Sequence, residues 1–489
     1  MSRYTSITDT DRQQMLAAIG VGSVRELFER QIPERLRLGR ALRLRVGGDD
    51  DHESDAGMGE EAVYEHLRAL AERNVSGEQQ LSFLGAGMYD HYAPAVVDML
   101  CERSEFLTPY TPYQPEVSQG GLQVMFEYQT AISELTGLPV SNASVYEGPS
   151  AVASAAYMAK LHNGRTRIVA SAGLHPHTLQ TLRTYAHGFG SELVEVPTGD
   201  GEHAGCTDHQ AWAAAIDEHT SAAIFAQPSF YGAVEDAQQL VRLARDAVGR
   251  GDGGDGVDGG DGADGPVVIA QVDPIALGVV KSPGECGVDV AVGEGQPLGG
   301  RLDFGGPSFG FFAATAAYLR RMPGRIAGET RDVDGRRGFV LTLQTREQHI
   351  RREKATSNIC TAQALNALAG VVYLGWLGRK GIVELGELLL ARTHYAKQRL
   401  TAIDGVSALH DGHSIRELAL HLDADVAAVR RRCVQDGVNP GVDVHALSGR
   451  EQDRGLLLVA LTERRDRRDI DTLADVLRVA MREHAGVPA

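Results

Sequence analysis

The stretch that decides the fold is Val267-Val-Ile-Ala-Gln-Val-Asp273, an apolar run that ends at an acidic residue. Its hydrophobic positions are mostly consecutive, which is typical of a strand covered on both faces. Similar runs occur on both sides of it, and segments with helical periodicity separate them. This alternation predicts an α/β fold with a mainly parallel sheet and crossover helices. The other runs are Arg167–Ser171, Leu193–Pro197, Ala222–Ala226 and Val288–Val292.

Working outward from this sheet, the sequence predicts three parts. A helical arm over residues 1–75 contains an acidic, glycine-rich stretch from Gly47 to Glu60. A large α/β domain follows over 76–325, and a smaller C-terminal α/β domain occupies 326–489. The low-complexity insert GRGDGGDGVDGGDGADG at 249–265 contains G-x-G-x-x-G patterns that neither follow a strand nor open a helix. We therefore expect a flexible loop there and not a nucleotide site.

Helical periodicity appears between the strands and again in the C-terminal part. The C-terminal part ends in a predicted strand over residues 456–461 and a predicted helix over Thr472–Glu483. The other expected helices are Gln123–Leu135, Ser150–Leu161, Trp212–Ile216, Leu240–Val248, Thr361–Leu377 and Ile382–Leu400.

The composition is that of an acidic globular protein. Lys and Arg number 48 against 65 Asp and Glu, which gives a net charge of −17. Such a chain repels phosphate, so we expect no nucleic-acid partner. No apolar run approaches the roughly 18 residues of a membrane span, and the amino terminus lacks an apolar signal core, so we expect no membrane partner and a cytoplasmic location. The five cysteines are scattered, and they suggest neither a disulfide framework nor a metal site.

Four positions in the α/β part have the chemistry of a ligand site. A turn of small residues opens the helix at Ser150, where free N–H groups attract an anion. His175 follows the strand Arg167–Ser171, and its ring can stack on a flat cofactor or simply cap the loop. Asp273 ends its strand, at the edge of the sheet where ligands of α/β proteins bind. Gln296 lies 23 residues later in a loop flanked by glycine and proline.

Taken in this order, these positions resemble the aspartate-aminotransferase-like fold, fold type I of the enzymes that use pyridoxal 5′-phosphate. The resemblance implies a phosphate turn at Ser150, a ring-stacking His175, Asp273 for the pyridine nitrogen and a cofactor-bearing lysine at Gln296. Glutamine has no amine for this bond, so we expect a degenerate site without a covalent cofactor. The spacing along the chain does not place any of the five lysines at this position. They are Lys160, Lys281, Lys354, Lys380 and Lys397.

Four longer strings are more specific. They are FLGAGMYDHYAP at 83–94, TPYTPYQPEVSQG at 108–120, PGECGVD at 283–289 and QTREQHIRREKATSNICT at 344–361. Together they closely resemble the P-protein family of the glycine cleavage system, glycine dehydrogenase (decarboxylating). They are most similar to the chain without the lysine, called subunit 1 or alpha where the protein is split in two. The resemblance runs from about Arg12 to the carboxyl terminus.

The resemblance implies that a partner chain, subunit 2, binds pyridoxal phosphate and forms an α2β2 assembly with this chain. The assembly decarboxylates glycine and transfers the aminomethyl group to the lipoyl group of the H protein, and this chain alone is inactive. Two alternatives stay open at this point. In the first, the chain is a purely structural or regulatory scaffold for subunit 2. In the second, it is a stand-alone pyridoxal-phosphate enzyme.

A rigid polar loop is the candidate contribution to a shared site. Three prolines stiffen the segment Thr108–Gln119, and a second candidate loop, Gly85–Tyr92, contains His91. An interface scaffold without a chemical role is the alternative for both loops, and a vestigial structural role is the alternative for the degenerate site. The candidate contributors are Tyr110, Tyr113, Gln114, Glu116 and Ser118, with Tyr89 from the second loop.

Overall fold

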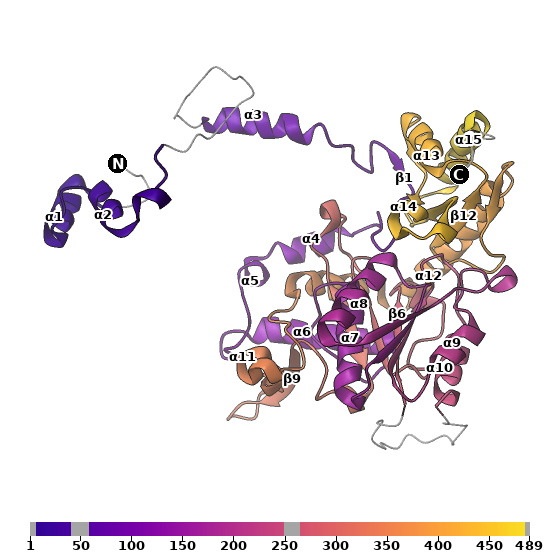
Figure 1. Cartoon of the computed structure of the whole chain (residues 1–489), viewed down its shortest axis with the longest axis horizontal. Helices are drawn as coiled ribbons and strands as arrows, with labels where there is room; N and C mark the ends of the chain where they lie inside the picture. The colour runs from indigo at the N-terminus through magenta and orange to yellow at the C-terminus, as the bar shows by residue number, and fades with distance from the viewer. Residues whose placement is uncertain (1–5, 41–57, 249–264, 485–489) are drawn as a thin grey trace. The chain divides into compact units, whose positions relative to one another are not determined.

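A computed structural model gives the structure of three ranges of the chain, residues 6–40, 58–248 and 265–484 (Figure 1). The acidic stretch expected between Gly47 and Glu60 falls mostly outside these ranges, and so does nearly all of the insert over 249–265. Within the three ranges, no helix combines the length and the apolar character that crossing a membrane requires.

The chain forms two compact units, Met1–Val75 and Ser76–Ala489. The first unit contains the helices α1 (Asp9–Ile19), α2 (Val24–Gln31) and α3 (Glu60–Ala71). Among its described residues only Val21 is a buried hydrophobic residue. These helices therefore have almost no core of their own, and their stability depends on local capping and on whatever their apolar faces contact.

The second unit is built on a seven-stranded sheet with the order β2-β8-β7-β6-β5-β3-β4. The pairs from β4 through β7 are parallel, whereas β8 pairs antiparallel with both β7 and β2. The mainly parallel α/β sheet expected from the sequence is thus confirmed. The strands are β2 (Val140–Ser141), β3 (Arg167–Ser171), β4 (Glu192–Val196), β5 (Thr220–Gln227), β6 (Val267–Val272), β7 (Val290–Glu294) and β8 (Gly310–Ala314).

Helices cover both faces of this sheet, as Figure 1 shows. Successive strand residues enter different cores, since Val169 and Phe225 pack on one face while Ile168 and Ile224 pack on the other. Every helix expected between the strands is present, with ends shifted by a few residues. The first face carries α6 (Gln119–Thr136), α9 (His209–Ala215), α10 (Ala237–Asp246) and α12 (Ala364–Leu400), and the second carries α7 (Gly148–Asn163) and α8 (Pro176–Phe189).

The expected helices Thr361–Leu377 and Ile382–Leu400 are both present and meet at a kink. They form the halves of α12, whose helical backbone is interrupted at Gly378, where φ is 63°. Glycine adopts this left-handed conformation without the steric cost that a Cβ brings. A change of direction therefore occurs inside one continuous element, and the sequence pattern showed it only as a gap between two apolar segments.

A smaller antiparallel sheet with the order β11-β12-β15-β14 lies in the C-terminal part of this unit. Two helices and the carboxyl end of α12 pack on its apolar face, where Leu418, Leu457 and Leu477 are fully buried in one core. A separate hairpin joins β9 (Ile326–Arg331) to β10 (Arg337–Thr342). The remaining elements are β11 (Val406–Ala408), β12 (Glu417–Leu422), α13 (Val426–Gln435), β14 (Val442–Asp443), β15 (Leu456–Ala460) and α15 (Arg467–His484).

A loop that begins after β1 runs between the four-stranded sheet and the seven-stranded sheet of this unit. The short strand β1 (Leu81–Ser82) pairs in parallel with β13 (Val438–Asn439). Ala460 N then donates to Phe83 O at 2.9 Å. These bonds fix the start of the loop that continues to Pro94, and the loop passes from the C-terminal sheet to the carboxyl end of β6.

Candidate functional site

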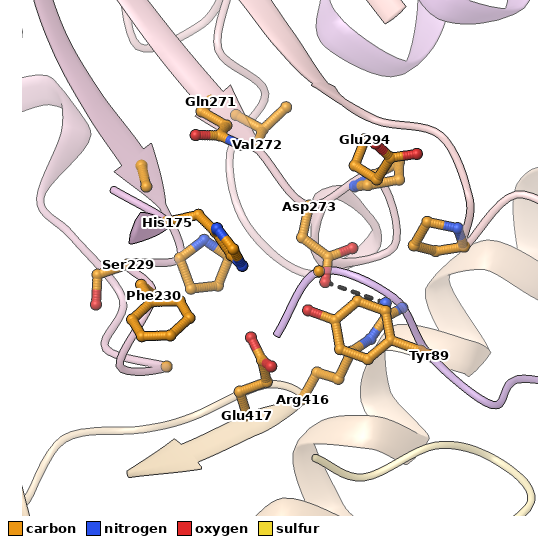
Figure 2. A pocket seen from close by; sticks show the side chains of 16 residues that line it. Tyr89, His175, Ser229, Phe230, Gln271, Val272, Asp273, Glu294, Arg416 and Glu417 are labelled. Atoms are coloured by element: carbon orange, nitrogen blue, oxygen red, sulfur yellow. Dashed lines mark ion pairs between the residues drawn. The ribbon is translucent and has the colours of Figure 1, made fainter. Parts of the chain in front are cut away.

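A small cavity lies at the carboxyl ends of the central strands (Figure 2). Its volume is ≈ 90 Å³. This end of an open α/β sheet is where such folds bind their ligands. Three parts of the second unit supply the walls, namely the loop after β1, the ends of the central strands and the start of β12. The polar and aromatic side chains are Tyr89, His175, Ser229, Phe230, Gln271, Asp273, Glu294, Arg416 and Glu417.

Asp273 directly follows β6 and faces an arginine of the same chain. Its Oδ1 accepts a hydrogen bond from Ile275 N at 2.9 Å, which orients the carboxylate. Its Oδ2 lies 3.4 Å from Arg416 Nη1 in a nearly buried ion pair. The dashed line in Figure 2 marks this pair. The acid that the resemblance assigned to a pyridine nitrogen is therefore neutralised by Arg416.

Buried Tyr89 and Arg416 form one cluster with half-buried Glu417. The Arg416 guanidinium lies over the Tyr89 ring, 4.2 Å from its centroid, in a cation–π contact. Glu417 Oε1 accepts a hydrogen bond from Ala86 N at 2.6 Å. Burial raises the pKa of Glu417 to about 7, and it raises the pKa of the Tyr89 hydroxyl well above its ordinary value. Glu417 therefore exchanges its proton near neutral pH, whereas Tyr89 keeps its own.

His175 caps α8 and lines the cavity. Its Nδ1 accepts a hydrogen bond from His177 N at 3.0 Å, so the ring proton sits on Nε2, which donates to Ala86 O at 2.9 Å. Burial lowers the pKa of His175 to about 4. The ring is neutral, both nitrogens are engaged, and its edge-to-face neighbour is Phe230 at 5.1 Å between centroids.

Carboxylates of the chain itself bind the amino end of α7. Glu147 accepts from Ser150 N at 3.0 Å, and Glu294 Oε2 accepts from Gly148 N at 2.9 Å. The hydroxyl of Ser308 donates to the other oxygen of Glu294. Burial raises the pKa of Glu294. The N–H groups that would attract a phosphate at a helix terminus are thus bonded to acidic side chains, and Ser150 does not line the cavity.

Gln296 holds a neighbouring loop in place. Its side-chain amide makes two hydrogen bonds with the backbone of Tyr89, accepting from N at 2.9 Å and donating to O at 2.9 Å. Its Nε2 also donates to Gly300 O at 3.0 Å, and the side chain is 1% exposed. The expected lysine position is therefore filled by an amide that fixes Tyr89, and His91 adds a ring contact to Gly300 O at 2.7 Å.

The candidate residues of the 108–119 loop lie away from this cavity. Tyr110 is 78% exposed and Tyr113 is 43% exposed, and Gln114 and Glu116 are also exposed. Ser118 precedes α6 and makes no side-chain capping bond. Of the six candidates for a shared site, the cavity therefore receives only Tyr89.

A second polar cluster joins two of the specific strings. Arg325, which is almost fully buried, donates from Nη2 to the Tyr113 hydroxyl at 2.6 Å and from Nη1 to Cys360 O. The same guanidinium lies 3.5 Å from Glu347 Oε2. His349 contacts both Glu347, at 3.5 Å, and the Tyr113 ring. The strings at 108–120 and 344–361 therefore form one surface around Tyr113.

Sequence reasoning missed the residues that complete these clusters. Arg416, Glu417 and Arg325 occur in ordinary stretches without a motif, and no periodic or spacing signal marks them. Glu294 does lie in the glycine-rich string GEGQ next to Gln296, where a polar residue after a strand was a usable signal.

Comparison with known proteins decides the family. A family model described as glycine cleavage system P-protein matches residues 2–477. The chain belongs to this family. A protein of Geotalea daltonii named probable glycine dehydrogenase (decarboxylating) subunit 1 is 44% identical, over 98% of this chain and 100% of its own length. A protein of the same name from Moorella thermoacetica is 44% identical, over 97% and 99%.

Solved structures agree with this P-protein assignment. A crystal structure of glycine decarboxylase (P-protein) of the glycine cleavage system, in inhibitor-bound form, has a TM-score of 0.82 and 37% identity, over 98% of this chain and all of that one. Glutamate decarboxylase of Lactobacillus brevis has a TM-score of 0.64 at 14% identity, covering 91% and 97%, which shows a shared fold. The expected fold type I of pyridoxal-phosphate enzymes is confirmed.

The cavity of this P-protein chain does not fit pyridoxal phosphate. A phosphate at α7 meets Glu147 and Glu294 in place of free N–H groups, and negative charges repel one another. Asp273 already faces Arg416. None of the chain's lysines, all of which lie in the described ranges, lines the cavity.

Proposed function

We propose that this chain is the lysine-free subunit of a two-subunit glycine dehydrogenase (decarboxylating), and that it works only with subunit 2. The observation that carries the proposal is the full-length similarity to proteins named subunit 1. It is supported by Gln296, which stands where the resemblance leads us to expect the lysine. Subunit 2 holds pyridoxal phosphate, which supplies the electron sink for loss of carbon dioxide from glycine. The lipoylated H protein accepts the aminomethyl group.

In this proposal the surface around Tyr113 faces subunit 2 in an α2β2 assembly. Prolines stiffen the loop that presents it, which limits the conformational entropy lost on binding. Buried Arg325 fixes the Tyr113 oxygen and leaves the hydroxyl proton free to donate toward a neighbouring molecule. Exposed Tyr110, Val117 and Ile350 supply the apolar contact area of the same face.

The decisive experiment mixes the purified chains. We expect glycine–bicarbonate exchange in the presence of lipoylated H protein only when this chain and subunit 2 are both present. The control is each chain alone at the same concentration, with the same H protein and pyridoxal phosphate. Full exchange by subunit 2 alone would contradict an obligate role, and full exchange by this chain alone would support a stand-alone enzyme.

A further inference from the structure

The cavity contains an arginine whose hydrogen-bonding capacity is not used. Arg416 is 4% exposed, and its Nε and Nη1 make no hydrogen bond to any described residue. Its only ion pair within the described ranges joins Nη1 to Asp273 Oδ2 at 3.4 Å. Buried N–H groups without an acceptor cost free energy. A carboxylate entering the cavity would accept from this guanidinium with the planar geometry that the two groups share.

The same cavity also has unused acceptors. Half-buried Glu417 accepts from Ala86 N and from the Tyr89 hydroxyl, and Asp273 lies across the cavity from it (Figure 2). An ionised carboxylate has about four acceptor sites, so both side chains can accept further hydrogen bonds. Gln271 Oε1 is buried and accepts no hydrogen bond from any described residue. An ammonium group donates three hydrogen bonds and carries the charge that these carboxylates attract.

Charge and size select among possible ligands. A simple anion meets Asp273, Glu417 and Glu294, whereas a simple cation meets Arg416. A molecule that carries both charges can pair its negative group with Arg416 and its positive group with the carboxylates. The ≈ 90 Å³ of space lies well below the roughly 300 Å³ at which drug-sized pockets begin. Gly232 closes one wall, since a Cβ there would lie 2.0 Å from Glu417 O.

We propose that this cavity binds a small zwitterionic α-amino acid without forming a covalent bond. Its carboxylate pairs with Arg416, and its ammonium group pairs with Glu417 and Asp273. The proposal needs neither a lysine nor a cofactor. It also stands apart from the proposed function, because the site lies within one chain and is measured without subunit 2.

The test measures ligand binding to the full chain alone, by saturation-transfer NMR and calorimetry. The probes are glycine, acetate as the carboxylate half and methylammonium as the ammonium half. We expect glycine to bind at least about tenfold more tightly than either half, which corresponds to roughly 1.4 kcal/mol. Arg416→Gln should weaken glycine binding by at least tenfold. The matched control, Arg399→Gln, changes a half-exposed arginine paired with Asp471 and should bind glycine like the parent chain.

Three results would overturn the proposal: no binding of glycine, equal binding of acetate and glycine, or unchanged binding in Arg416→Gln. Circular dichroism and thermal melting check that each variant is folded. If Arg416→Gln does not fold, Glu417→Gln serves in its place, since it keeps the side-chain shape and removes the negative charge. Unchanged glycine binding in a folded Glu417→Gln variant would equally contradict the proposal.

Discussion

Gln296 shows how one side chain changes the role of a whole site. A lysine amine at this position would only donate hydrogen bonds, whereas the glutamine amide both donates and accepts them. It uses both functions on the backbone of Tyr89. Gln296 thus holds a loop in place, and the loop places the Tyr89 ring against the Arg416 guanidinium.

Gln296→Lys should not restore a covalent cofactor. The new amine cannot accept the hydrogen bond from Tyr89 N, and burial penalises its charge, so we expect a loss of about 2–4 kcal/mol in the free energy of unfolding. Urea denaturation measures this loss. Incubation with pyridoxal phosphate followed by borohydride should label no lysine in stoichiometric amount. The control Gln398→Lys, at an exposed position of α12, should change stability by less than about 0.5 kcal/mol. A stable, fully labelled Gln296→Lys chain would refute this account.

Glu235 should give the fold a measurable pH dependence. Burial raises its pKa to about 7, although Thr207 donates to it from both N and Oγ1. The Cys206 thiol also hydrogen-bonds Glu235, and the Asp236 carboxylate repels its charged form. Because its pKa in the folded state exceeds the unfolded value of 4.5, the folded chain binds the proton more tightly. Its contribution to stability is therefore complete below pH 4.5 and is lost as the pH rises toward 7.

The variant Glu235→Gln isolates this effect. Its amide oxygen can still accept from Thr207, and it does not titrate, so its stability should decline less than that of the parent chain between pH 5 and pH 8. The difference is on the order of 1–3 kcal/mol, measured by urea denaturation at several pH values. Both chains keep the parallel contribution of Glu417 and the opposite contribution of His175 below pH 6.5. An identical pH profile for the two chains would show that Glu235 does not titrate in this range.

At the scale of elements, the positions of loops decide which chemistry is available. The loop after β1 is tied to the C-terminal sheet and lines the internal cavity, whereas the loop over 108–119 is held by Arg325 and faces outward. The sequence features of the two loops are similar, since each combines tyrosines with glycine or proline. Their anchoring contacts make one internal and the other exposed.

Tyr113→Phe tests whether the outward loop contributes chemistry or only contact area. The change removes one hydroxyl and leaves the ring in place, so assembly with subunit 2 should persist. We expect glycine–bicarbonate exchange by the mixed chains to fall about tenfold or more in kcat, as loss of a single positioned hydrogen bond does. The control Tyr157→Phe removes a hydroxyl from a ring of α7 stacked on Phe189. Unchanged kcat with intact assembly would favour the scaffold alternative.

At the scale of the molecule, residues far apart in the sequence make the contacts that join the seven-stranded and four-stranded sheets of the second unit. Arg416 and Asp273 are far apart in sequence, and so are Tyr89 and Gln296. Such contacts form only when both sheets are in place. The cavity is thus a product of the complete second unit and not of either sheet alone.

The Gly/Asp-rich insert should be dispensable at this scale. Deleting residues 251–263 shortens a connection between α10 and β6, and a long loop adds little to the entropy of chain closure. We expect assembly with subunit 2 and exchange activity within about twofold of the parent, measured by size-exclusion chromatography and by the exchange assay. A large loss of activity in an assembled complex would mean that the insert carries a ligand or a partner contact.

The sequence alone determined the sheet and the family. Apolar runs such as Val267–Val272 must be covered on both faces, so they define parallel strands wherever they occur, and the four long strings carry the P-protein resemblance. Asp273 was correctly placed at the end of its strand for the same local reason. The antiparallel β8 was missed because its pairing depends on the strands β2 and β7 that lie on either side of it.

The composition of the site depends on contacts between residues far apart in the sequence. Arg416 and Glu417 lie in a stretch without a motif, and packing of the C-terminal sheet against the central one brings them to Asp273. Whether a buried charge is paired depends on its distance in space from an opposite charge, because the Coulomb energy depends on that distance and not on separation in the sequence. The absence of a lysine could be read from the letters, whereas the closed phosphate turn, the tie from Gln296 to Tyr89 and the unused donors of Arg416 required the folded chain.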